Sequence, residues 1–195
     1  MAGGFVFCEY SSLQDDFRKF QQTLASLESK VIEETARSWA PMSFGGMTPG
    51  SGQFGRTTIL PPLFNDVNGN QMATWRQNFT STGHQTIMTG TRAGNTIPED
   101  FKVGWMGLAF PNKEMNITEL KWQIGDRRYG RVNVEEMKVY DQPALVFEEG
   151  LVINEEESFE LYAYVENTGY QRIVPLGFCV YKVINKVLGN PGAAI

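Results

Sequence analysis

The chain has 195 residues, of which 42% are hydrophobic and 12% aromatic, and its formal net charge is −5. A chain of this length and composition can bury the core of one sandwich- or barrel-sized domain, and it lacks the composition of a disordered protein. The modest negative charge argues against a general binder of nucleic acid or anionic membranes, although it leaves room for a local basic patch.

The two cysteines, Cys8 and Cys179, are too few for a disulfide framework. We expect free thiols that pack as small hydrophobic side chains. The N-terminus lacks the basic segment and long apolar run of a signal peptide, and no stretch approaches the length of a transmembrane helix. These patterns predict a protein that is made and assembled in the cytoplasm, without a cleaved targeting segment.

The first predicted element is a helix over residues 11–38, within an N-terminal arm of residues 1–40. Ser11 or Ser12 can cap its start. Apolar residues then follow at alternating spacings of four and three, which is a heptad seam: Leu13, Phe17, Phe20, Leu24, Leu27 and Val31. Two interpretations of the seam remain open. It packs against the chain's own sheet, or it forms an oligomer interface with a neighbouring subunit.

Residues 41–195 are predicted to form a single β-sandwich domain. Its first part, residues 41–100, is rich in loops, with short strands at Arg56–Leu60 and Thr86–Thr91. Loops this long and neutral suit a surface that other protein covers. Regular strands follow over residues 101–187, and residues 188–195 form a tail.

The regular strands are short and separated by turn residues, without intervening helices. They are expected at Phe101–Phe110, Ile117–Ile124, Arg131–Val139, Ala144–Phe147 and Leu151–Ile153, with a bulge at Glu135-Glu136 where the alternation changes phase. A hairpin is expected over Ser158–Lys186, because two alternating stretches flank Asn167-Thr168-Gly169. The predicted fold class is therefore mainly β: an antiparallel, jelly-roll-like β-sandwich with one N-terminal α-helix.

Catalytic and metal-binding patterns are missing from the sequence. The single histidine, His84, cannot supply a zinc pair, and no nucleophile elbow or phosphate-binding loop occurs. The acidic runs Glu148-Glu149 and Glu155-Glu156-Glu157 fit solvated strand ends better than an acid–base pair. We expect no enzyme activity, no cofactor and no metal.

Two groups of residues are candidates for binding. Arg127, Arg128 and Arg131 form a basic cluster around an aromatic residue, which suits contact with an anion or nucleic acid, or with acidic residues of a neighbouring strand or subunit. Trp105, Tyr162 and Tyr164 suit an aromatic surface, because such side chains combine apolar area with a polar tip.

An N-terminal helical arm, a neutral loop-rich segment and a β-sandwich body together resemble the layout of jelly-roll virion coat proteins. The resemblance is architectural and extends over the whole chain. It implies a self-assembling structural subunit of a virion, whose partners are copies of itself and other structural proteins. The alternative is a carbohydrate-binding β-sandwich module or lectin-like adhesin.

Overall fold

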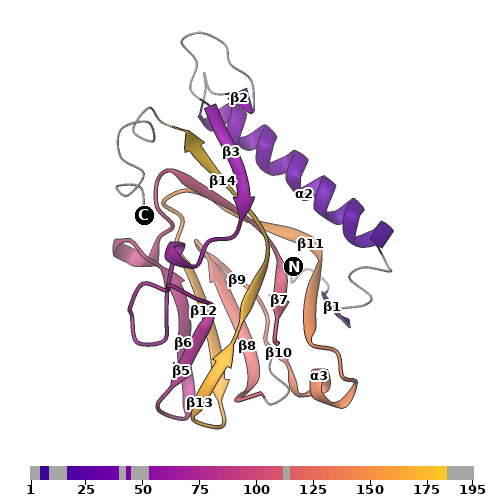
Figure 1. The fold of residues 1–195 in the computed structure, drawn as a ribbon, viewed down its shortest axis with the longest axis vertical. Helices are drawn as coiled ribbons and strands as arrows, with labels where there is room; N and C mark the ends of the chain where they lie inside the picture. Colours follow the sequence, from indigo (N-terminus) through magenta and orange to yellow (C-terminus); the bar gives the residue numbers. More distant parts are fainter. Residues whose placement is uncertain (1–4, 9–16, 40–42, 45–52, 112–114, 184–195) are drawn as a thin grey trace.

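The computed structural model describes residues 5–8, 17–39, 43–44, 53–111 and 115–183. Two β-sheets pack face to face, and one long helix, α2 (Phe17–Ser38), lies across the outer face of one sheet (Figure 1). Buried side chains from both sheets meet between them in one hydrophobic core.

Sheet A has the strand order β1-β11-β7-β14-β3-β2, and sheet B has the order β10-β8-β12-β6-β4 with β9 beside β8. The strands of sheet A are β1 (Phe5–Cys8), β11 (Ala144–Ile153), β7 (Phe101–Ala109), β14 (Val174–Val183), β3 (Gln53–Thr58) and β2 (Ser43–Phe44). Those of sheet B are β10 (Val132–Asn133), β8 (Ile117–Ile124), β12 (Phe159–Val165), β6 (Gly83–Gly90), β4 (Phe64–Asn65) and β9 (Arg127–Arg128).

A third sheet pairs β5 (Arg76–Phe79) with β13 (Gly169–Arg172). The short helices are η1 (Pro61–Leu63), η2 (Ala93–Asn95) and α3 (Glu135–Val139).

The pairing of the eight principal strands is nested. In chain order these strands are β3, β6, β7, β8, β10, β11, β12 and β14, and the first pairs with the last, the second with the seventh, the third with the sixth and the fourth with the fifth. The ladders β7–β14 and β8–β12 then complete the two sheets. One long antiparallel ribbon is thus wound into two sheets, which is the jelly-roll arrangement. The predicted mainly β sandwich with one principal helix is confirmed.

The predicted hairpin over Ser158–Lys186 is wrong, although both of its strands form. β12 lies between β6 and β8 in sheet B, whereas β14 lies between β7 and β3 in sheet A. The chain bends at the expected turn, where Gly169 has φ of +134°. It then forms β13 and crosses to the other sheet.

The strand predicted at Arg131–Val139 is also wrong over most of its length. Only Val132–Asn133 is strand, and Glu135–Val139 is the helix α3. The change of phase marks the start of this helix rather than a bulge. Two glutamates stand in its first turn, where the positive end of the helix dipole favours them.

The strands predicted at Ala144–Phe147 and Leu151–Ile153 are one continuous strand, β11. Its pairing with β7 is irregular between Val146 and Leu151. The acidic pair Glu148-Glu149 therefore lies inside a strand, at an exposed irregularity, and does not flank two separate strands.

Aromatic rings fill the space between the sheets. The ring of Trp105 lies 4.9 Å from that of Phe147, 5.3 Å from that of Phe159 and 5.6 Å from that of Trp122. Trp105 is 1% exposed, so its prediction as a surface aromatic is wrong. Its indole N–H donates to the carbonyl oxygen of Gly107 at 2.6 Å, which satisfies the polar atom inside the core.

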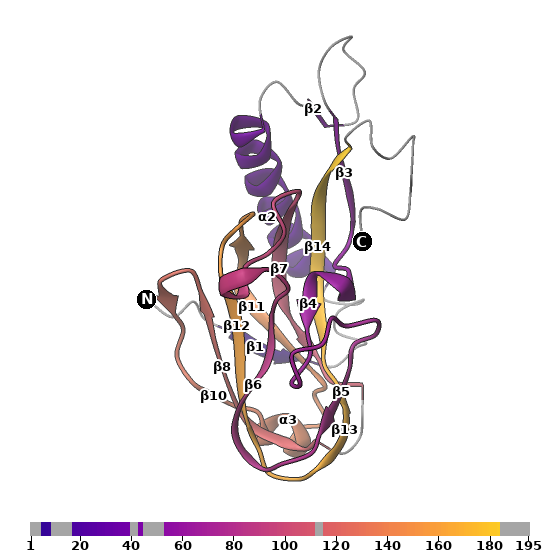
Figure 2. The ribbon, with the colours of Figure 1, turned by 90° about the vertical axis from the view of Figure 1, so that its left-hand side faces the viewer.

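The helix α2 covers the outer face of sheet A (Figure 2). Leu27 and Val31 are buried there, in a second cluster that includes Met106 of β7 and Phe178 of β14; Leu24 is partly buried against the same cluster. Packing within the chain therefore leaves Leu27 and Val31 no free surface for a neighbouring subunit. Leu13 and the side chains of Phe17 and Phe20 lie outside the described residues.

Candidate functional site

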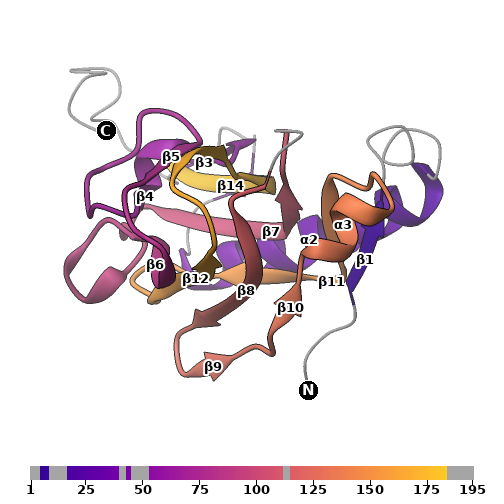
Figure 3. The same ribbon diagram turned by 90° about the horizontal axis from the view of Figure 1, so that it is seen from below.

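The outer face of sheet B is the open face of the sandwich. Helix α2 lies over sheet A and does not cover the outer side of β6, β12 and β8 (Figures 2 and 3). The short helix η2 contacts β6, and its Asn95 reaches Glu160 of β12. Since aromatic rings fill the space between the sheets, groups that could bind a partner are found on the outer surface.

Tyr162 stands near the middle of this open face. Its hydroxyl donates to the carboxylate of Glu160, which also accepts from the side-chain amide of Asn95. The ammonium of Lys121 lies 4.9 Å from the centre of the Tyr162 ring. Burial and the hydrogen bond to Glu160 raise the pKa of Tyr162 to about 12, while the charge of Arg128 opposes this rise.

Tyr164 is the more accessible tyrosine of the face, at 40% exposure. Its ring meets that of His84 edge-on, with the centroids 5.0 Å apart. Directly opposite Tyr164 on β8 is Glu119, whose carboxylate forms an ion pair of 3.4 Å with Arg131. The tyrosine face of β12 is thus partly open: Tyr164 is exposed, Tyr162 is half-buried, and α2 does not cover them.

The predicted arginines adjoin the same face. Arg127 and Arg128 are exposed on β9, opposite Ile124 and Gln123 at the end of β8. Arg131 immediately precedes β10 and reaches Glu119. The fold therefore brings together the basic cluster and the two tyrosines, which are about 30 positions apart in the sequence.

A polar cluster that the sequence did not predict fixes the C-terminal end of α2 to the sandwich. The indole N–H of Trp39 donates to Glu155, and Lys182 bonds to the other oxygen of the same carboxylate at 3.0 Å. Lys102 is 2% exposed and donates to the Ser38 hydroxyl at 2.7 Å. Burial lowers the pKa of Lys102, while the charges of Glu34 and Glu155 oppose the shift.

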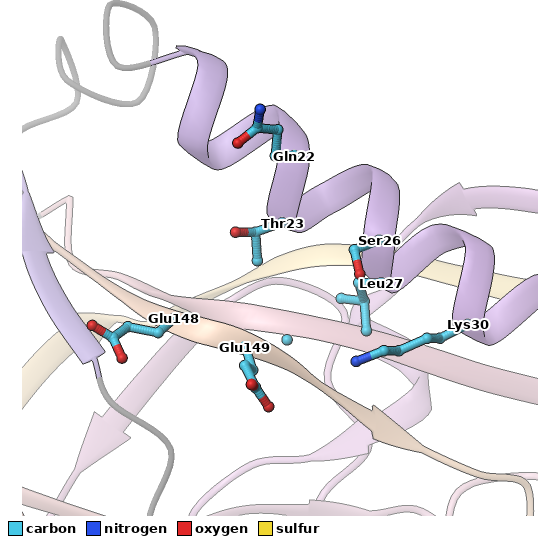
Figure 4. A pocket seen from close by; sticks show the side chains of 8 residues that line it. Gln22, Thr23, Ser26, Leu27, Lys30, Glu148 and Glu149 are labelled. Carbon is cyan, nitrogen blue, oxygen red and sulfur yellow. The ribbon is translucent and has the colours of Figure 1, made fainter.

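A shallow groove of about 260 Å³ lies between α2 and β11 (Figure 4). Its lining residues are Gln22, Thr23, Ser26, Leu27, Lys30, Glu148, Glu149 and Gly150. The two glutamates lie at the irregularity of β11, where both are exposed, and their carboxylates point in different directions (Figure 4). Across the described residues, no cluster of three or more His, Cys, Asp or Glu could hold a metal ion.

The end strand of sheet A, β1, has an apolar edge. Its sequence is Phe-Val-Phe-Cys, and Phe5 and Val6 are 39% and 47% exposed. β1 pairs with β11 on one side and is the terminal strand of the described sheet. Natural edge strands are commonly protected by charge or proline, and β1 has neither.

No protein-family model, no curated protein and no solved structure matches the chain. None of the helices in the described ranges is long and apolar enough to cross a membrane. The structure is a jelly-roll β-sandwich with α2 packed on the outer face of sheet A.

Proposed function

We propose that the protein is a self-assembling structural subunit, a virion coat or capsid-associated protein. The observation that carries the proposal is the nested strand pairing, since the jelly roll is an architecture of capsid subunits. Lectins and cupins share this architecture. The aromatic filling between the sheets favours a role at the outer surface over one that needs an internal ligand cavity.

The exposed edge of β1 is the surface we assign to assembly. A neighbouring strand could pair alongside β1 and cover the exposed side chains of Phe5 and Val6. The ends of sheet B are less suited to this, because β10 and β4 are two residues long. Leu27 and Val31 of the helical seam do not contribute to this surface, because they pack against sheet A of the same chain.

Within this proposal the outer face of sheet B contacts a second structural protein or enclosed nucleic acid in the virion. Arg127 and Arg128 supply exposed positive charge, and Tyr164 supplies exposed aromatic area beside it. Arg131 is less available, because it is paired with Glu119.

Light scattering coupled to size exclusion tests the proposal over a range of protein concentrations. We expect species well above the chain mass of 21.9 kDa, and we expect Val6→Lys to shift them toward the monomer. Thr82→Lys is the matched control, since Thr82 is exposed just before β6 of sheet B, whereas β1 belongs to sheet A. A strict monomer at every concentration contradicts self-assembly.

The second candidate is a carbohydrate-binding module. It is favoured by exposed tyrosines on an open sheet face, Tyr164 above all. Binding on a glycan array that is lost in Tyr164→Ala, from a protein that remains monomeric, would favour this candidate. Trp105→Ala is unsuitable for the test, because it would open a cavity in the core.

A further inference from the structure

Lys102 of β7 is the one charged residue that is buried in the described part of the chain, at 2% exposure. No carboxylate of the described residues lies within ion-pair distance of its amine. The hydrogen-bond partners of this amine are two neutral oxygens: the Ser38 hydroxyl at 2.7 Å and the side-chain amide oxygen of Asn154 at 3.4 Å. A buried ammonium without an ion pair is costly, because the protein interior disfavours the charged form.

The register of sheet A places Lys102 directly opposite Asn154. β7 and β11 are antiparallel, and Val103 pairs with Ile153; Lys102 precedes the first of these residues and Asn154 follows the second. Side chains at opposed positions of two strands interact. The amide carbon of Asn154 lies one C=O bond, about 1.2 Å, from the oxygen that the lysine Nζ contacts. A small movement of the flexible lysine chain therefore brings Nζ to the attack distance of about 3–3.5 Å from this carbon.

The surroundings of Lys102 favour the neutral amine, which is the nucleophilic form. Burial lowers the pKa of Lys102, and the charge of Lys182 adds to this effect. Three carboxylates oppose the shift, in the order Glu34, Glu155 and Glu157. Glu34, on α2, acts most strongly and forms no ion pair of its own among the described residues. Glu34 is therefore the carboxylate that can carry a proton to or from Lys102.

We propose that Lys102 and Asn154 form an intramolecular isopeptide bond once the chain has folded. The neutral Nζ attacks the side-chain carbon of Asn154, so that a new C–N amide bond forms and the bond from this carbon to Nδ2 breaks. Glu34 accepts the proton from Nζ and passes it to the departing nitrogen, which leaves as ammonia. Proximity drives the step, since well-placed intramolecular groups react as if at about 10⁵–10⁸ M. The bond joins β7 to the end of β11, and the proposal does not rest on self-assembly.

Mass spectrometry of the denatured full chain tests the proposal. We expect an intact mass that is lower than the sequence mass by one ammonia, about 17 Da, and a tryptic fragment in which Lys102 is joined to Asn154. Lys102→Met and Asn154→Ala should both restore the sequence mass, because each removes one reacting group. Lys121→Met is the matched control, since it removes a half-buried lysine of sheet B and should keep the lower mass. Glu34→Gln should leave most chains unlinked, whereas Glu33→Gln, which changes the exposed neighbour, should not.

Two results overturn the proposal. The first is an intact mass equal to the sequence mass in a wild-type protein whose cooperative thermal unfolding shows it to be folded. This result is decisive even where a variant fails to fold. The second is a loss of ammonia that persists in Lys102→Met, which would indicate cyclisation of an asparagine on its own. Complete linkage in Glu34→Gln would overturn the role assigned to Glu34.

Discussion

The indole N–H of Trp39 donates a 2.6 Å hydrogen bond to Glu155, 116 positions away in the chain. Lys182 bonds to the same carboxylate, and its ammonium lies 4.7 Å from the centre of the Trp39 ring. The end of α2 is therefore joined to β14 and to the β11–β12 connection through one carboxylate.

Removal of this carboxylate's charge should loosen the helix. We expect Glu155→Gln to lower the free energy of unfolding by about 1–3 kcal/mol, because the bonds from Trp39 and Lys182 to a charged acceptor weaken. Urea denaturation measures the change. Glu156→Gln, which alters the exposed neighbour, is the control and should have little effect. Equal losses in the two variants would show that the bond to Trp39 contributes nothing specific.

Leu27→Ala should destabilise the folded monomer itself. Leu27 is 2% exposed against sheet A, and truncation of a buried leucine typically costs about 2–5 kcal/mol. Urea denaturation at low protein concentration measures the loss, with the exposed neighbour changed in Ser26→Ala as the control. Should Leu27→Ala instead dissociate an oligomer and leave the monomer's stability unchanged, the helix would pack against a neighbour.

The Tyr162 hydroxyl should make stability depend on alkaline pH. Its pKa is raised in the folded chain to about 12 from an ordinary value of 10.0, so the unfolded chain loses this proton first. The associated stability is fully present below pH 10 and is lost as the pH rises toward 12. We expect urea midpoints of wild type and Tyr162→Phe to converge over this range, and Tyr164→Phe serves as the control. A gap that stays constant with pH would contradict the assignment.

The thiol of Cys179 should be unreactive in the native protein. Burial raises its pKa to about 12, and the thiol donates to the carbonyl oxygen of Thr58 at 3.2 Å. In a Cys8→Ser variant, a thiol reagent at pH 8 should modify no cysteine until denaturant is added, since the thiolate is the reactive form. Rapid modification of the native variant would show that β14 opens readily.

Strands could be predicted from the sequence where one face of the strand is buried and the other is exposed to solvent. The alternation of apolar and polar residues predicted strands at Ile117–Ile124 and Phe159–Val165, and the structure has both strands with these bounds. Alternation defines the faces of a strand but not its neighbours. The sequence therefore could not show that β12 and β14 belong to different sheets.

The predictions were wrong where one sequence pattern fits two different structures. Val134 and Met137 are both buried and three positions apart, which fits the short helix α3 as well as a strand with a bulge. Trp105 lies in the nearly continuous apolar run of β7, a pattern typical of a strand covered on both faces. The guanidinium of Arg76 stacks on the ring of Tyr170 only because β5 pairs with β13, which is distant in the sequence, so no local pattern could reveal this contact.

The nested pairing has a consequence for the order in which the chain folds. β8 and β10 are the innermost pair of the nested ribbon, and each outer pair closes a longer loop, ending with β3 and β14. Since loop closure costs more entropy as the loop lengthens, we expect the ribbon to close outward from β8 and β10, with slow overall folding. Helix α2 needs β7 and β14 side by side before it can dock, so its amides should be among the last protected in pulsed hydrogen exchange. Protection of α2 before β14 would contradict this order.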